Sequence, residues 1–250
     1  MTNLVTISVV SHGQIELVAG LLADIAKYCT AGGVEIILTL NLPEELPFSE
    51  GEYPFSLRVV RNAWPRGFGE NHNKAFKMAR GGFFCVMNPD ICFDHDPFHT
   101  LVACLGDSSI GVAAPIVLNE GGKIEDSVRR FPTPFKIICK AFAKCNSHDY
   151  VISDEPIYPD WAGGMFLLFP RAVFDRLGGF DQRYFLYYED VDICARLRLL
   201  GYKVVVCPQA RVIHHAHRSS HGSFRYLRWH VRSMMRFFFS SVYWQLQRRK

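Results

Sequence analysis

The last forty residues of this 250-residue chain contain no aspartate and no glutamate. Nine arginine and lysine residues lie in the same stretch, from Arg211 to Lys250, although the formal charge of the whole chain is only +4. Such a local excess of one charge predicts an anionic partner for this end of the chain, either a membrane surface or a nucleic acid.

The chain also has few features of a secreted or membrane-spanning protein. No uncharged apolar run approaches the length of about 18 residues that a transmembrane helix needs, and no basic segment followed by an apolar block indicates a signal peptide. The eight cysteines include no CxxC pair, and Cys85, Cys104 and Cys207 lie in apolar runs, where a reduced thiol acts as a small hydrophobe. We therefore expect a reducing compartment and a cytoplasmic location, free or at the membrane surface.

Short apolar runs alternate with helical patterns in the N-terminal half of the chain. Runs at 5–10, 34–40, 57–60 and 83–88 predict strands, and the apolar stripe over 18–25 predicts a helix between the first two. Strands that are apolar on both faces and alternate with helices are typical of a mostly parallel central sheet with helices on both faces. The sequence therefore predicts an α/β fold.

Polar residues follow several of these predicted strands. Ser11 and His12 follow the first strand, Asn62 follows the third, and Asn88 and Asp90 follow the fourth. Ligands of such sheets bind beyond the carboxyl ends of the strands. Each of these residues can also belong to an ordinary turn, so both interpretations stay open.

An aromatic run at 184–188 leads into three acids, Glu189, Asp190 and Asp192. The acids begin a predicted helix, and Asp192 and Arg196 have the spacing of an ion pair on one helix face, so capping and pairing can explain them. The aromatic residues are not explained in this way. They would place carboxylates beside an apolar wall, where burial raises the carboxylate pKa and can produce a base near neutral pH.

Two further segments are candidates for ligand contacts. The small residues of the segment 161–164 allow close approach of a ligand to the backbone, although a β-bulge is an alternative. Two short predicted strands, 203–207 and 210–213, lead into four histidines between His214 and His221. These histidines lack a zinc-site spacing, so we expect one of them to be a single metal ligand.

Taken in order, these segments resemble an inverting family 2 glycosyltransferase with the GT-A fold, and the likeness extends from residue 4 to about residue 235. The matching segments are Val9-Val10-Ser11-His12-Gly13, Gly67-Phe68-Gly69-Glu70-Asn71-His72-Asn73-Lys74-Ala75, Met87-Asn88-Pro89-Asp90, Trp161-Ala162-Gly163-Gly164, Phe180-Asp181, Tyr188-Glu189-Asp190-Val191-Asp192 and Val212-Ile213-His214. Within the family, the segments 129–133, 180–185 and 228–233 are most similar to bacterial rhamnosyltransferases that act on polyprenyl-diphosphate-linked N-acetylglucosamine.

The resemblance implies a role for each of these segments. Asp190 is the expected general base, with Glu189 beside it, and Asp90 and His214 are the expected ligands of Mg²⁺ or Mn²⁺. The donor-binding residues that it implies are Ser11, His12, Asn41, Gly67, Phe68, Gly69, Asn73, Asn88 and Asp90. The acceptor-binding residues that it implies are Trp161, Gly163, Gly164 and Asp181.

The sequence departs from the family pattern at two places. No carboxylate follows the second strand until Glu44, so nucleobase recognition is expected to rest on Asn41 and backbone groups. Asn88 replaces the first acid of the metal-binding motif, which leaves Asp90 as one carboxylate and weakens cation binding.

The chain is thus expected to have a glycosyltransferase domain at 1–220 and a basic, aromatic, amphipathic helix at 221–250. Arg225, Arg228, Arg232 and Arg236 are expected on one face of that helix, and Leu227, Val231, Met234, Phe238 and Val242 on the other. Packing against the domain could explain the apolar face, and so could a position in the headgroup layer of a membrane.

The expected reaction is transfer of L-rhamnose from its dTDP donor onto a lipid-linked glycan, at the inner face of the cytoplasmic membrane and without a nucleic-acid partner. A related transferase that uses a galactofuranose or hexose donor is one alternative. The other alternative is a non-catalytic nucleic-acid-binding protein, which would explain the basic end of the chain but not the acids at the strand ends.

Overall fold

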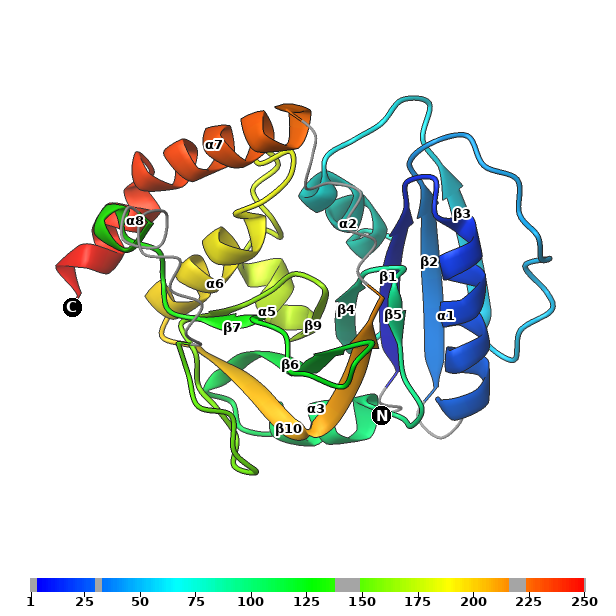
Figure 1. The fold of residues 1–250 in the computed structure, drawn as a ribbon. Helices are drawn as coiled ribbons and strands as arrows, with labels where there is room; N and C mark the ends of the chain where they lie inside the picture. The colour runs from blue at the N-terminus through cyan, green and yellow to red at the C-terminus, as the bar shows by residue number, and fades with distance from the viewer. Residues whose placement is uncertain (1–3, 30–32, 138–148, 216–223, 250) are drawn as a thin grey trace.

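The computed structural model describes residues 4–29, 33–137, 149–215 and 224–249. An eight-stranded sheet with the order β3-β2-β1-β4-β9-β6-β10-β5 forms its centre (Figure 1). Its strands are β1 (Val5–Ser11), β2 (Val34–Leu40), β3 (Ser56–Arg61), β4 (Phe83–Met87), β5 (Ile91–Cys92), β6 (Ile110–Asn119), β9 (Phe166–Pro170) and β10 (Lys203–His214). A separate antiparallel pair consists of β7 (Val128–Arg129) and β8 (Trp161–Ala162).

The predicted mostly parallel sheet is confirmed. The strands β1 to β4 run parallel to one another, as do β6 and β10. Between these groups β9 runs antiparallel to β4 and to β6, and β5 pairs antiparallel with β10 at the sheet edge. The two short strands expected at 203–207 and 210–213 form the single strand β10, whose pairing with β6 shifts between Cys207 and Arg211. Pro208 lies in this shift, where it has no backbone N–H to donate to the ladder.

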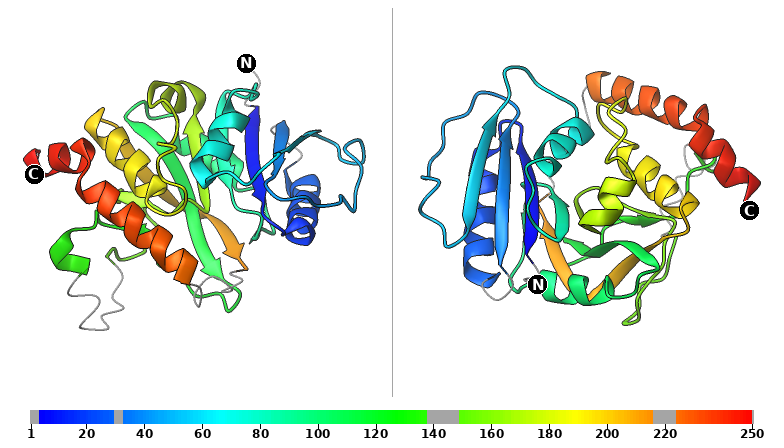
Figure 2. Two further views of the ribbon diagram at one scale, coloured as in Figure 1. Left: turned by 90° about the horizontal axis from the view of Figure 1, so that it is seen from above. Right: turned by 180° about the vertical axis from the view of Figure 1, so that it is seen from behind.

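Helices cover both faces of the sheet, as predicted. They are α1 (Ile15–Tyr28), α2 (Phe68–Phe76), α3 (Phe98–Cys104), α5 (Arg171–Arg176), α6 (Glu189–Leu199), α7 (Phe224–Phe238) and α8 (Ser241–Arg248). The apolar residues of α1 and α3 form one core with one face of the sheet, and those of α2, α5, α6 and α8 form a second core with the opposite face. Figure 2 shows α1 and α2 on opposite sides of β1.

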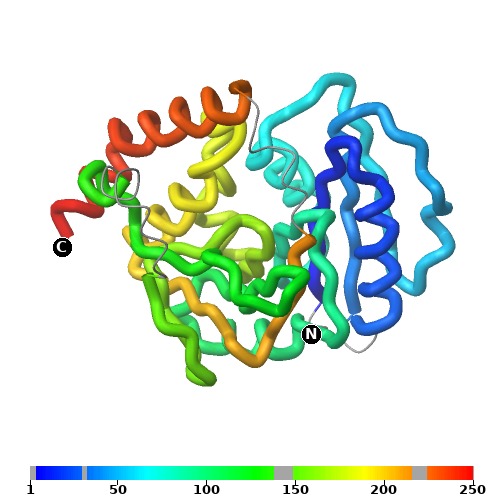
Figure 3. Tube along the Cα trace, in the orientation of Figure 1, coloured from blue at the N-terminus to red at the C-terminus, as the bar shows by residue number. Residues whose placement is uncertain are grey.

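The C-terminal segment forms two helices instead of the single helix that we expected. The side chain of Ser240 accepts a hydrogen bond from the Tyr243 amide at 3.1 Å, which caps a new helix and ends the previous one. Figure 3 shows the chain turning from α7 into α8 beside α6. Phe237, Tyr243 and Leu246 are buried in the core that contains α6.

The expected division of α7 into a basic face and an apolar face is wrong in part. Met234 and Phe238 pack against the core, but Leu227 and Val231 are 59% and 43% exposed. Arg236, which we expected on the free basic face, is half-buried. The reason is that the buried side of α7 is centred on Ser233 and Phe237, which lie between the predicted apolar and basic faces.

Cys104 on α3 and Cys207 on β10 lie next to each other in the core, with their Cα atoms 7.2 Å apart, because α3 packs directly against β10. Among the described residues, no helix is long and apolar enough to cross a membrane.

Candidate active site

Asp90 and His214 meet at the edge of the sheet, as the resemblance implied. The pairing of β10 with β5 places His214 opposite Ile91, and the His215 amide donates to the Asp90 carbonyl at 2.9 Å. The Nε2 atom of His214 then lies 3.2 Å from Oδ2 of Asp90, and its Nδ1 atom lies 3.0 Å from Oε2 of Glu125. Burial disfavours the charged imidazole, but the two carboxylates outweigh it and raise the pKa of His214.

This arrangement fits a divalent cation. The Oδ1 atom of Asp90 is buried and has no hydrogen-bond partner within the described part of the chain. Glu125 occupies Nδ1 of His214, so Nε2 faces Asp90 as a potential ligand. No group of three or more His, Cys, Asp or Glu side chains suited to a metal occurs among the described residues. A cation held by Asp90 and His214 would therefore complete its coordination with substrate oxygens and water.

His215 contacts a different acid: its Nδ1 atom lies 2.9 Å from Oε1 of Glu120. His217 and His221 lie outside the described residues. Sequence reasoning missed Glu125, which is 89 positions from His214, since no local pattern connects them.

The turn after β1 is fixed by Glu44, a second residue that sequence reasoning did not include in the site. Its carboxylate accepts hydrogen bonds from the Ser11 hydroxyl at 2.9 Å and from the amides of Gly13 and Ile15 at 3.0 Å. The first acid after β2 therefore holds the turn that carries Ser11 and His12. A negative charge at this position also suits the N-terminus of α1.

Asn41 forms the centre of a polar network at the ends of β1, β2 and β3. Its amide lies 3.1 Å from Nδ1 of His12 and donates to the Arg66 carbonyl at 3.0 Å. Its carbonyl oxygen accepts from the Arg66 amide and from the side chain of Asn62, which also donates to Asn71. Asn41 is thus where the donor-binding role was expected, but its side chain is occupied in positioning its neighbours.

Gly67, Phe68 and Gly69 lie against the aromatic segment that precedes α6. The Phe68 amide donates to the Phe185 carbonyl at 2.8 Å. A Cβ atom on Gly67 would lie 2.8 Å from that same carbonyl, and one on Gly69 would lie 2.6 Å from the Cβ of Phe180. Both positions therefore require glycine for close packing, and the loop joins α2 to the segment carrying the acids.

Asn73, which we expected at the donor site, connects two distant segments of the protein. It is buried, and its amide group both donates to the Phe180 carbonyl and accepts from the Phe180 amide, each at 2.8 Å. This pair of bonds connects α2 to a residue 107 positions away. The side chain is buried and satisfies both the amide and the carbonyl of the Phe180 backbone.

Asp190 is held at the start of α6 by two backbone amides. Gly164 donates to Oδ2 at 3.1 Å and Val191 donates to Oδ1 at 2.8 Å. Asp190 Cβ and the Phe68 ring both lie 3.5 Å from the Cβ position of Gly164. The acceptor segment and the glycine-rich loop predicted from sequence therefore converge on the predicted base.

The backbone before Asp190 has an uncommon conformation. Tyr187 and Tyr188 have φ values of 68° and 67°, in the left-handed region that residues with bulky side chains rarely adopt. Such conformations cost about 1–3 kcal/mol each and occur preferentially at functional sites. They are supported here by α7, where the Ser233 hydroxyl donates to the Leu186 carbonyl at 2.8 Å and the Trp229 ring lies 4.8 Å from that of Phe185.

The acids at the start of α6 have raised pKa values. Burial raises the pKa of Glu189 well above its usual range, and the adjacent charge of Asp190 raises it further. Burial also raises the pKa of Asp190, although the amides of Val191 and Gly164 oppose this effect. The Oε2 atom of Glu189 is buried without a hydrogen-bond partner among the described residues. Burial therefore favours the neutral form of Glu189, whereas Asp190, held by two amides, is positioned to exchange a proton.

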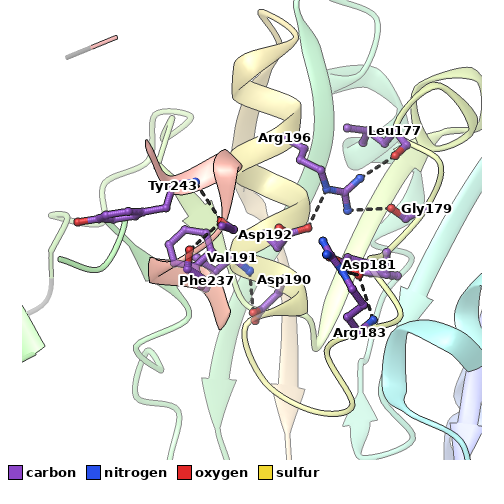
Figure 4. A network of polar contacts seen from close by, with 12 residues as sticks. Leu177, Gly179, Asp181, Arg183, Asp190, Val191, Asp192, Arg196, Phe237 and Tyr243 are labelled. Atoms are coloured by element: carbon purple, nitrogen blue, oxygen red, sulfur yellow. Dashed lines mark hydrogen bonds and ion pairs between the residues drawn. The ribbon is translucent and has the colours of Figure 1, made fainter. Parts of the chain in front are cut away.

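Asp192 and Asp181 belong to ion pairs on the other side of α6 (Figure 4). Asp192 binds Arg196 at 2.7 Å, as the spacing predicted, and Arg196 also donates to the carbonyls of Leu177 and Gly179. Asp181, expected at the acceptor site, pairs with Arg183 at 2.6 Å. In Figure 4 the Asp190 carboxylate lies at the first turn of α6, apart from these pairs.

Trp161 and Gly163 belong to the segment 161–164, in which the Gly164 amide binds Asp190. The Trp161 indole donates to the Arg130 carbonyl at 3.1 Å, and the Gly163 amide donates to the Ser127 carbonyl at 2.9 Å. Asn88 contacts the same segment, because its backbone N–H donates to the Met165 carbonyl at 2.9 Å. The strand end that carries Asp90 is thus joined through the segment 161–165 to the acids of α6.

Comparisons with known proteins agree with this arrangement. A family model described as glycosyl transferase family 2 matches residues 9–167, and one described as glycosyltransferase like family 2 matches residues 157–235. Rhamnosyltransferase WbbL of Escherichia coli K12 is 32% identical over 185 residues, covering 68% of this chain and 69% of that protein. An N-acetylglucosaminyl-diphospho-decaprenol L-rhamnosyltransferase of Mycobacterium tuberculosis is 30% identical over 159 residues. That match covers 59% of this chain and about half, 52%, of the mycobacterial protein.

Solved structures share the fold at low sequence identity. GalNAc-T7 with UDP, GalNAc and Mn²⁺ has a TM-score of 0.66 at 15% identity, covering 85% of this chain and 43% of that one. The mannosyltransferase PcManGT of Pyrobaculum calidifontis, with GDP-Man and Mn²⁺, has a TM-score of 0.62 at 17% identity, covering 86% and 58%. These findings select the enzyme over the non-catalytic nucleic-acid-binding alternative. The chain belongs to glycosyltransferase family 2 and has the GT-A fold.

Proposed function

We propose that this enzyme transfers L-rhamnose from dTDP-rhamnose to a glycan linked through a diphosphate to a polyprenyl lipid, with inversion at the anomeric carbon. The observation that carries the proposal is the environment of Asp190. It is a single carboxylate with a raised pKa, held by two amides where the segments 67–69 and 161–164 meet. The names of the two relatives described above support rhamnose as the sugar and a lipid-linked acceptor.

Asp190 acts as the general base in this reaction. Its carboxylate accepts the proton of the acceptor hydroxyl as that oxygen attacks the anomeric carbon of the donor. The bond from the anomeric carbon to the nucleotide diphosphate breaks on the opposite face, and the diphosphate leaves with the bonding electrons. One displacement produces one inversion, and it requires one carboxylate base. Burial and the adjacent charge of Asp190 raise the pKa of Glu189, which favours a neutral carboxyl beside the base.

Asp90 and His214 would hold Mg²⁺ or Mn²⁺, which stabilises negative charge on a leaving diphosphate. The buried, unpartnered Oδ1 atom of Asp90 supports this assignment. Glu125 orients the imidazole of His214, and the backbone bond from His215 to Asp90 keeps the two ligands together. The solved neighbours that contain Mn²⁺ support a divalent cation in this fold.

The outward side of α7 supports a peripheral position on the inner face of the cytoplasmic membrane. Phe224 and Met235 are 81% and 44% exposed on the same side as Leu227 and Val231. The exposed basic side chains of α7 lie among them: Arg225, Arg228 and Arg232. A helix that presents both apolar and basic side chains to solvent is suited to the headgroup layer of an anionic membrane.

A panel of nucleotide sugars tests the proposed function. The full-length protein is incubated with each donor, Mn²⁺ and a synthetic lipid-diphosphate N-acetylglucosamine, and the product is identified by mass spectrometry and by the configuration of the new glycosidic bond. We expect transfer from dTDP-rhamnose with inversion. Transfer from a galactofuranose or hexose donor in place of dTDP-rhamnose would overturn the sugar assignment, and retention of configuration would overturn the single displacement.

A further inference from the structure

Four side chains from separate elements lie near the predicted base, in the region where α7 packs. Arg129 lies on β7, Trp161 on β8 and His230 on α7. Tyr188 is the residue that precedes α6. The Arg129 guanidinium lies over the Trp161 ring, 5.7 Å from its centroid, and the Tyr188 and His230 rings are 5.5 Å apart. Tyr188 lies two residues before Asp190 in the sequence. Trp161 lies three residues before Gly164, whose amide binds Asp190. These side chains therefore form a wall next to the base.

Arg129 is fixed in position but remains accessible. Its Nε atom donates to the Asp126 carbonyl at 2.9 Å, and its Nη2 atom lies 2.8 Å from the Asp126 carboxylate. These contacts use one edge of the guanidinium, and the side chain is still 37% exposed. A planar guanidinium that is already oriented loses little conformational entropy when it binds a second anion.

The positive charge of Arg129 contributes to the pKa values of Tyr188, His230 and Asp190. Burial lowers the pKa of His230, and Arg129 lowers it further. Burial and then the charge of Asp190 raise the pKa of Tyr188, and Arg129 limits this rise. Arg129 also favours the ionised form of Asp190, after the stronger effects of burial and the backbone amides. Arg129 thus places one positive charge close to Tyr188, His230 and Asp190.

We propose that Arg129, together with Trp161 and His230, forms the binding site for the diphosphate of the lipid-linked acceptor. This inference rests on the proposed function, because it assumes an acceptor whose sugar is attached through a diphosphate. The neutral imidazole of His230 can donate one hydrogen bond to a phosphate oxygen, and the guanidinium of Arg129 can donate two in parallel. The class of ligand is a sugar diphosphate with an apolar tail.

The order of the elements matches the order of groups in such an acceptor. The reacting hydroxyl must lie at Asp190, the diphosphate lies one sugar ring away, and the lipid continues toward the membrane. In the structure the Tyr188 ring, two residues from Asp190 in the sequence, contacts the His230 ring, and His230 belongs to α7, which also exposes Leu227, Val231 and Met235. Arg129, which lies over the Trp161 ring three residues before the Gly164 that binds Asp190, is the cation we assign to the diphosphate.

Two acceptors and three variants test this inference. One acceptor is N-acetylglucosamine linked through a diphosphate to a farnesyl chain, and the other is octyl N-acetylglucosaminide, which lacks the diphosphate. The variants are Arg129→Gln, Arg129→Lys and, as a matched control, Arg130→Gln. Arg130 is the next residue, with the same charge, but it is exposed and lies over the ring of Tyr150. For each protein we would measure kcat/KM for both acceptors, and the Kd of the diphosphate acceptor without donor.

We expect Arg129→Gln to weaken binding of the diphosphate acceptor by about 10- to 100-fold, as for the loss of a charge-assisted contact. The preference of kcat/KM for the diphosphate acceptor over the octyl glycoside should fall by a similar factor. Arg129→Lys should restore part of this preference, and Arg130→Gln should keep the wild-type preference.

Other outcomes would overturn the inference. An equal loss on both acceptors would show that Arg129 acts on the base or on the fold. A wild-type protein without preference for the diphosphate would exclude the site, whereas the proposed function would stand if that protein still transferred rhamnose. Arg129-dependent binding of the diphosphate acceptor without transfer from any donor would support the inference and contradict the proposed function.

Discussion

His214 lies between two carboxylates, with Nε2 at 3.2 Å from Asp90 and Nδ1 at 3.0 Å from Glu125. Only a doubly protonated imidazole can donate to both acids at once. If a cation replaces the proton on Nε2 of His214, the proton on Nδ1 can still be donated to Glu125. The imidazole ring then keeps its orientation. Glu125 thus already orients His214 through Nδ1 and leaves Nε2 for a ligand, as is common for metal-binding histidines.

Removal of divalent cations should suppress transfer, and Mn²⁺ should restore it better than Ca²⁺, because Mn²⁺ accepts a nitrogen ligand more readily. His214→Ala should lower Mn²⁺ affinity more than His215→Ala, whose imidazole pairs with Glu120. Glu125→Gln should lower the affinity by about 10- to 100-fold, as is typical for loss of an outer-shell partner. Titration of Mn²⁺ by electron paramagnetic resonance measures these affinities without turnover. Full activity in excess EDTA would contradict a metal requirement.

Asp190→Asn should preserve the fold and abolish most transfer, because an amide cannot accept the proton of the acceptor hydroxyl. The expected loss in kcat is about 10²- to 10⁴-fold. Glu189→Gln is the matched control, since it makes the same change from carboxyl to amide at the adjacent acid and a glutamine has the same shape. Single-turnover kinetics with saturating donor would measure both. A larger loss for Glu189→Gln than for Asp190→Asn would assign the base to Glu189.

The raised pKa of Asp190 predicts the pH dependence of the reaction. A base is active when deprotonated, so kcat/KM should rise with pH through the pKa of Asp190. Burial places this pKa above the usual aspartate value of about 3.9, so the acidic limb should lie above that value. The limb should disappear in the residual activity of Asp190→Asn. An acidic limb at or below the ordinary aspartate value would show that the base is not the buried carboxylate.

Asn73→Ala should lower the stability of the protein. It leaves the amide and the carbonyl of Phe180 without their partners in a buried region, at a cost of about 1–3 kcal/mol each. Asn119→Ala is the matched control, because its side-chain oxygen accepts from the amides of Gly121 and Lys123 in an exposed turn, where water can replace it. Urea denaturation compares the two variants. A stable Asn73→Ala protein that has lost affinity for the nucleotide sugar would return Asn73 to the donor site.

The protein should sediment with anionic vesicles, and high salt should release it only in part, because α7 exposes apolar as well as basic side chains. Reversing Arg228 and Arg232 to Glu should weaken vesicle binding by at least about 30-fold, from about 1 kcal/mol per basic residue. The matched control reverses Arg58 and Arg61, which are exposed on the edge strand β3. A wild-type protein that stays in the supernatant at low salt would contradict a membrane role for α7.

The sequence predicted those parts of the fold that depend on local patterns. The apolar runs predicted the strands, and the acids of α6 were placed correctly because their spacing and the preceding aromatic residues are contiguous. Asp90 and His214 could be predicted as neighbours only through the resemblance to a family. The direction of β9 was not predictable from its own residues, because Phe166 to Phe169 are apolar like the parallel strands beside them.

Contacts between distant segments account for what the sequence did not predict. Nothing near Asn73 indicates that its amide binds Phe180, and nothing near Glu125 indicates His214. The buried side of α7 was also misplaced, because apolar residues occur on both sides of that helix. Which of them are covered is decided by the loop 185–188, which the helix packs against.

The bond from Ser233 to Leu186 and the contact between Phe185 and Trp229 have a practical consequence. Removal of the last two helices would be an obvious way to obtain a version of the enzyme that stays off membranes. The same cut would take away the support of the two tyrosines in left-handed conformation, and with it the placement of Asp190. Surface substitutions such as those at Arg228 and Arg232 are therefore the better test of the proposed membrane contact, since they leave this support in place. The helix proposed to contact the membrane also supports the backbone that positions the proposed base, so a truncation would change both at once.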